Sequence, residues 1–178
     1  MDRGAWWATV QGVTKLSQIR PAYYYALQRY NRALKQRGEA LKVIAAQPAF
    51  LSTLDAWDEQ LADAGAELTR HRRAYIERLS RVAAETHRSI ADDRERLEIR
   101  YLPSVAAGDD PQANLEALFG AREGDLRRLV TSVGAHRDDV QILVEGRDVR
   151  AFGSQGQQRT AALSMRLSEL DVMRGLSR

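Results

Sequence analysis

A stretch rich in glycine, serine and glutamine, FGSQGQQRT at residues 152–160, holds the residues best suited to chemistry. Gly153 and Gly156 allow positive φ and let a backbone approach a ligand closely, and Ser154 adds a hydroxyl donor. A helix that starts near Gln157 would direct unpaired backbone amides and its positive dipole end outward. These features meet the requirements of an anion site. The simpler interpretation is a glycine-rich turn that caps a helix, and the residues alone leave both open.

A second polar group, HRDD, begins with His136 and Arg137 and could suggest a metal site or a general base. A lone histidine beside charged residues is more often part of a solvated or hydrogen-bonded loop. The three histidines, at positions 71, 87 and 136, lack the spacing of zinc ligands, and the chain has no cysteine. We therefore expect no catalytic residue and no metal site.

Arginines crowd the segment between residues 70 and 88 and alternate with glutamates. Most such patterns are solvated helix faces with charge pairs four residues apart. The alternative is a surface that follows nucleic-acid phosphates, for which Arg72 and Arg73 are the candidates. Tyr24 and Tyr25 are then candidate stacking contacts.

Two long helices should position these groups. Pro21 suits a first helical turn, and an apolar seam follows at Tyr23, Leu27, Tyr30, Leu34 and Leu41, with one turn skipped at Arg37. Pro48 ends this segment. A second seam predicts a helix from about Ser52 to about Ile90, too long for a small globule. We expect the two helices to pack as an antiparallel pair.

The remaining segments predict a small mixed part. LEIRY at 97–101 and the residues from Val140 to Val144 alternate as strands do, and Asp110 caps a helix beginning at Pro111. A last helix carries Leu163, Leu167 and Leu170 on one face. The fold class is therefore mixed α/β, a long antiparallel helical arm with a few strands. The expected organisation is an unassigned leader at 1–16, a helical arm at 17–95 and a further domain at 96–178.

Composition is that of a globular protein, with 178 residues, 44% of them apolar, and a net charge of +3. The mild basic excess is compatible with a polyanionic partner without requiring one. No window is apolar enough for a membrane span, and the first residues lack the apolar core of a secretory signal. We expect a cytoplasmic chain.

Several separated strings resemble the RecF family, recombination mediators of the ABC/SMC class of ATPases. AFGSQGQQRTAALSMRLSEL at 151–170 is similar to the family's signature segment, and GAHRDDVQILVEGRDVR at 134–150 to the segment before it. PAYYYALQRYNRALKQR at 21–37 and LDAWDEQLADAGAEL at 54–68 resemble its helical lobe. The order of the strings is that of the family. The resemblance implies that the domain at 96–178 is a partial ABC-type ATPase head.

The resemblance also implies a role for each candidate. In ABC-type heads the signature serine and glycine hold the γ-phosphate of ATP bound by the opposite subunit, so ATP closes a head-to-head dimer. Ser154 and Gly156 would be these contacts, Gln155, Gln157 and Gln158 would shape the loop, and Arg159 would steady it or add charge. His136 and Arg137 would lie near the nucleotide-facing surface.

The chain also departs from the family. No GxxxxGK followed by Ser or Thr occurs, and no strand ending in paired acidic residues follows the last helix. We expect a central to C-terminal fragment that lacks the Walker A and Walker B segments. Such a chain alone would bind neither ATP nor magnesium, the cofactors of the full-length family, and would not hydrolyse ATP.

For the whole protein, the resemblance implies ATP-dependent binding of single-stranded or gapped DNA. The work would be recombinational repair linked to the SOS response, with RecR and RecO as partners and without a membrane. Two alternatives remain, a non-enzymatic helical module for protein interactions and a truncated product without function.

Overall fold

The computed structural model describes residues 20–176, and the leader predicted at 1–16 lies outside them. The described chain forms two compact units. We name residues 20–71 with 103–138 the helical unit, and residues 72–102 with 139–176 the sheet unit. One long helix, α4 (Thr53–Ile90), contributes residues to both units. The domain boundary predicted between residues 95 and 96 stays a prediction.

In the helical unit, α3 (Pro21–Ala46) begins at the predicted proline. Its buried face is Tyr23, Ala26, Tyr30, Ala33, Arg37, Leu41 and Ile44. The sequence suggested that the buried seam skips one turn at Arg37, and this prediction was wrong. The Arg37 side chain is fully buried and paired with carboxylates of two other helices. Burial of this arginine is tolerated because its charge is paired and its Nε and Nη1 donors find partners.

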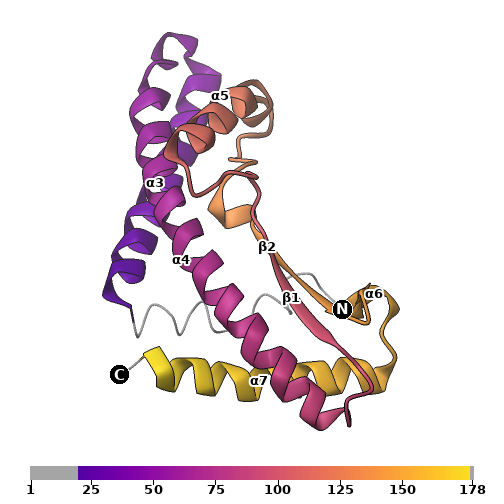
Figure 1. Ribbon diagram of the computed structural model, residues 1–178. Coiled ribbons are helices and arrows are strands. Elements are labelled where there is room, and N and C mark those ends of the chain that lie inside the picture. The colour runs from indigo at the N-terminus through magenta and orange to yellow at the C-terminus, as the bar shows by residue number, and fades with distance from the viewer. Residues whose placement is uncertain (1–19, 177–178) are drawn as a thin grey trace. The chain divides into compact units, whose positions relative to one another are not determined.

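A short 3-10 turn, η1 (Pro48–Phe50), connects α3 to α4. The two helices run antiparallel, and Figure 1 shows them side by side at the indigo end of the chain. Three contacts fix their register. The rings of Tyr23 and His71 meet edge to face at 6.0 Å, Arg29 forms an ion pair with Glu67, and Arg37 pairs with Asp58. Rising residue numbers on α3 meet falling numbers on α4. The predicted antiparallel pair is confirmed.

The helical unit is completed by α5 (Pro111–Arg128) and by the short turn η2 (Ala135–Arg137). Asp110 caps α5 as predicted, since its carboxylate accepts a hydrogen bond from the Gln112 N–H at 3.1 Å. Leu118 is buried, whereas Phe119 is exposed and lies 3.7 Å beneath the Arg122 guanidinium. A small cluster of Leu41, Ile44 and Leu54 packs against Leu126.

In the sheet unit, β1 (Leu97–Leu102) pairs antiparallel with β2 (Asp139–Val144), and β2 with the short β3 (Arg147–Asp148). The β2–β3 turn has positive φ at both Glu145 and Gly146, as a two-residue hairpin of type I′ requires. A hydrogen bond links the sheet to α4: the Ile99 N–H of β1 donates to the Ser80 hydroxyl of α4 at 2.9 Å. These strands lie where the alternation predicted them.

The chain ends in α6 (Val149–Phe152) and α7 (Gln155–Leu176). Helix α7 buries a face of small and apolar residues, among them Ala161, Met165 and Val172. The predicted leucine face exists, but Leu163, Leu167 and Leu170 are exposed by 51%, 43% and 49%. The mixed α/β class with long helices is confirmed.

Candidate anion-binding site at the start of α7

The loop before α7 turns sharply at Gly153, which ends α6. The backbone of Gly153 is extended, with φ −73° and ψ 137°, so positive φ does not explain this glycine. A Cβ there would meet the Val149 carbonyl oxygen at 2.6 Å and the Val149 Cγ2 at 2.7 Å. Gly153 is therefore required by the close approach of its own chain.

Helix α7 begins at Gln155, two residues before the predicted start, and Ser154 is its N-cap. The Gln157 N–H donates to Ser154 Oγ at 3.2 Å, and the Ser154 N–H donates to Gln157 Oε1 at 3.0 Å. This reciprocal pair is a capping box. The spacing Ser-x-x-Gln was available in the sequence as its signal.

The capping box decides which donors face outward. The cap engages the amides of residues 154 and 157, and the Gln158 N–H bonds to the Ser154 carbonyl at 2.9 Å. Within the described chain, no partner occurs for the amides of Gln155 and Gly156. Because Ser154 Oγ accepts from Gln157, its own proton is free to point outward. Two backbone amides and one hydroxyl, all on exposed residues, thus form a donor set for an anion.

Gly156 has space above it. A Cβ at this position would meet only Ser154 Oγ, at an ordinary 3.7 Å. Glycine inside a helix costs about 1 kcal/mol relative to alanine. The packing of this chain does not account for that cost, whereas a ligand that approaches the backbone closely would.

Two glutamine side chains hold the loop in place. Gln157 Nε2 donates to Glu95 Oε1 at 2.9 Å, and Gln158 Nε2 donates to the Gly153 carbonyl at 3.1 Å. The other carboxylate oxygen of Glu95 lies 3.5 Å from Nε2 of the buried His87. Sequence reasoning missed Glu95, since nothing in its neighbourhood distinguishes it from other surface glutamates. Arg159 is exposed, and its predicted role stays a prediction.

His136 and Arg137 belong to the helical unit, whereas Ser154 belongs to the sheet unit. His136 Nδ1 accepts from the Tyr30 hydroxyl at 2.7 Å, and its Nε2 donates to the Thr131 carbonyl at 2.9 Å. Burial lowers the pKa of His136, because it disfavours the charged imidazolium. The ring therefore acts as a structural link in its unit. Arg137 is exposed and donates to the same carbonyl at 3.3 Å. Nucleotide proximity stays a prediction for both.

The arginines predicted to contact DNA are less accessible than a solvated helix face implies. Arg72 is only 6% exposed, and Arg73 is half-buried. Arg70 is exposed, but its Nη1 donates to the Asp109 carbonyl at 2.9 Å. The alternation of Arg and Glu did not distinguish the buried positions from the exposed ones. DNA contact through Arg72 would require this side chain to leave its buried position.

Two further features concern the whole described range, residues 20–176. Within this range, no three His, Asp or Glu side chains gather as a metal site would require. None of the helices there combines the length and the hydropathy that a bilayer crossing demands.

The curated relatives of this chain agree with the resemblance that its motifs suggested. The DNA replication and repair protein RecF of Symbiobacterium thermophilum is 45% identical over 168 residues, which cover 89% of this chain and 44% of that protein. RecF of Acetivibrio thermocellus is 36% identical over 165 residues, 89% of this chain and 45% of that protein. No family model matches the chain. The chain spans less than half the length of these relatives.

Solved structures agree with the sequence relatives. The recombination mediator protein RecF with ATP superposes with a TM-score of 0.89 at 33% identity, and the same protein with ATPrS with 0.88 at 34%. Both superpositions cover 96% of this chain and 47% of the solved chain. Over about nine tenths of its length, this chain is homologous to part of the DNA replication and repair protein RecF, as its motifs predicted.

Proposed function

We propose that the first turn of α7 holds the terminal phosphate of an ATP molecule presented by another polypeptide. The observation that carries the proposal is the donor set of Ser154, Gln155 and Gly156, with open space over Gly156. A helix N-terminus favours an anion through its dipole and its unpaired amides. The likeness to RecF solved with ATP supports the identity of that anion.

The chain then serves as one part of a RecF-like protein that binds single-stranded or gapped DNA under the control of ATP. Closure of two ATPase heads on ATP and magnesium would bring the α7 donors against the nucleotide. RecF works in the RecFOR pathway in the solved relatives, which supports RecO and RecR as partners. Recombinational repair in the cytoplasm, linked to the SOS response, is the setting this function implies.

The chain by itself supplies the phosphate contact and not the hydrolysis. Its sequence lacks GxxxxGK followed by Ser or Thr, the loop that cradles phosphates in this class. Without that cradle the positioning on which phosphoryl transfer depends is missing. Incubation of the purified chain with ATP and magnesium should therefore release no phosphate above background.

Association with a RecF-type head that carries a phosphate loop tests the proposal. The head and this chain should associate in the presence of ATP, and Ser154→Arg should abolish the association because its side chain fills the anion site. Ser52→Arg, at an exposed residue of the helical unit, is a control for an added arginine. Association that is indifferent to ATP would favour the alternative, a helical module for protein interactions.

A further inference from the structure

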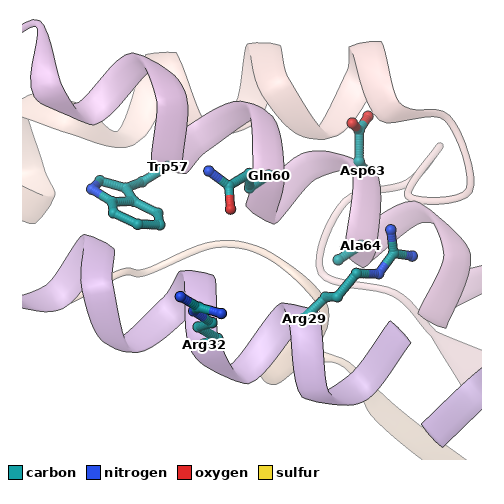
Figure 2. A pocket seen from close by; sticks show the side chains of 6 residues that line it. All are labelled: Arg29, Arg32, Trp57, Gln60, Asp63 and Ala64. Atoms are coloured by element: carbon teal, nitrogen blue, oxygen red, sulfur yellow. The ribbon is translucent and has the colours of Figure 1, made fainter. Parts of the chain in front are cut away.

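A cavity of about 440 Å³ opens between α3 and α4 in the helical unit. It is lined by Arg29, Arg32, Trp57, Gln60, Asp63 and Ala64. Figure 2 shows Trp57 and Gln60 projecting from α4, and Arg32 reaching up from α3 on the other side. The indole is half-buried, and part of its surface faces the cavity.

The charges of the cavity favour an anion. Arg32 is exposed and has no hydrogen bond or ion pair within residues 20–176. Arg29 pairs with Glu67 but keeps 61% of its side chain exposed. Asp63 is the one carboxylate in the lining, and in Figure 2 it points away from α3. The arginine side of the cavity is therefore positive.

An exposed tyrosine extends this surface along α3. Tyr25, Arg29 and Arg32 follow the spacing i, i+4, i+7, so they share one face of the helix. None of the three belongs to the buried face of α3. Tyr25 is 65% exposed, and its ring meets Tyr24 edge to face at 5.7 Å. The rings of Tyr25 and Trp57 thus accompany the two arginines on this surface of the helical unit.

We infer that this surface binds a short stretch of single-stranded nucleic acid. One base stacks on the Trp57 indole and a second base, several nucleotides further along the same strand, stacks on Tyr25, while Arg29 and Arg32 bind the phosphates between them. Interleaved aromatic and basic side chains are the general means of binding an unpaired strand. The Gln60 amide lies beside the indole, where it can bond to the edge of the stacked base.

Other polyanions fit less well. A duplex keeps its bases paired and stacked on one another, so it offers no free face to Trp57 or Tyr25. An acidic peptide would satisfy the arginines but would leave both rings without a stacking partner. The inference rests on the DNA-binding part of the proposed function and is independent of the ATP contact at α7.

Fluorescence of Trp57 tests the site directly. The sequence holds three tryptophans, Trp6, Trp7 and Trp57, so a chain with Trp6→Phe and Trp7→Phe reports on Trp57 alone. Titration with a 15-nucleotide oligothymidylate in the absence of ATP should quench its emission. Blunt duplex and poly-glutamate of matched charge should leave the emission nearly unchanged.

Variants of the full chain separate stacking from charge. In anisotropy measurements with the labelled oligonucleotide, Trp57→Ala should weaken binding by about tenfold or more. Arg32→Gln should lower the slope of log affinity against log salt by about 0.7. Phe50→Ala and Lys35→Gln remove an exposed ring and an exposed charge outside the cavity, and they should leave affinity unchanged. Circular dichroism of each variant verifies its fold.

The possible results separate failure of the Trp57 site from failure of DNA binding by the chain. Binding of the oligonucleotide with an unchanged Trp57 emission, and with variants that equal their controls, would overturn the site while leaving DNA binding in place. Absence of any binding would overturn both, without bearing on the ATP contact. Quenching by poly-glutamate equal to that by oligothymidylate would overturn the nucleic-acid assignment in favour of an acidic peptide.

Discussion

Arg37 of α3 donates through Nε to Asp58 of α4 at 2.5 Å, and both side chains are fully buried. The same guanidinium donates through Nη1 to Asp125 Oδ2 of α5 at 2.8 Å and to the Thr131 hydroxyl at 2.9 Å. Arg122 adds a further donor to Asp58, at 2.8 Å. One buried cation therefore joins the three helices of the helical unit.

Removal of this cation should be costly. Arg37→Met leaves two buried carboxylates with fewer partners, and we expect the free energy of unfolding to fall by about 3–5 kcal/mol. Urea denaturation followed by circular dichroism measures the loss. Lys42→Met, which breaks the exposed pair with Glu39 on the same helix, should change stability by about 0.5 kcal/mol or less. Equal effects of the two variants would contradict the buried network.

The two glycines of the loop should respond in opposite ways. Gly153→Ala forces a Cβ against Val149 and should destabilise the chain, whereas Gly156→Ala has room and should stabilise it by up to about 1 kcal/mol. Association with an ATP-loaded head should nevertheless weaken in Gly156→Ala. Gly120→Ala in α5, where a Cβ meets nothing within 4 Å, is the matched control with unchanged association. An undiminished association of Gly156→Ala would remove the reason we give for this glycine.

Ser154 can be divided into a cap and an anion contact. Ser154→Ala should cost about 1 kcal/mol of stability because it removes the N-cap. Ser154→Asp should keep the cap, since a carboxylate accepts from the Gln157 N–H, but its charge should repel a triphosphate. We therefore expect thermal stability close to the unmodified chain together with lost ATP-dependent association. Retention of that association in Ser154→Asp would show that the serine has no role beyond capping.

Stability should depend on pH through His136. Burial lowers the pKa of this imidazole, so the folded state holds its proton less tightly than the unfolded chain. The stabilisation is complete above the unfolded pKa of about 6.5 and is lost as the pH falls through the folded pKa. His136→Gln keeps a donor to Thr131 and an acceptor for Tyr30 without titrating. The difference in the free energy of unfolding between the unmodified chain and His136→Gln should narrow from pH 8 to pH 5. A constant difference would argue against a role of His136 in the pH dependence. His71, whose pKa is also lowered chiefly by burial, is present in both chains and cancels.

Periodicity located the strands and the long helices, since burial along one face imposes a fixed spacing whatever the rest of the fold. It misjudged Arg37, because the partners that make its burial tolerable, Asp58 and Asp125, lie 21 and 88 residues away. For the same reason it could not separate the buried Arg72 from its exposed neighbours.

The anion site was partly within reach of the sequence. The glycines, the serine and the following helix located it, and Ser-x-x-Gln encoded its cap. Why each glycine is present was not accessible, because the answer depends on Val149 at one position and on empty space at the other. Glu95 is 62 residues from Gln157 and became visible only in three dimensions.

The leucine face of α7 has a practical consequence for work with the purified chain. Leu163, Leu167 and Leu170 are exposed to water and form an apolar stripe on α7. Soluble monomers rarely expose contiguous apolar surface of this kind. Concentrated samples should therefore cluster reversibly, the more so in kosmotropic salts such as sulfate, which strengthen apolar attraction. Light scattering across a dilution series would detect the clusters, and a glutamate in place of Leu167 should disperse them.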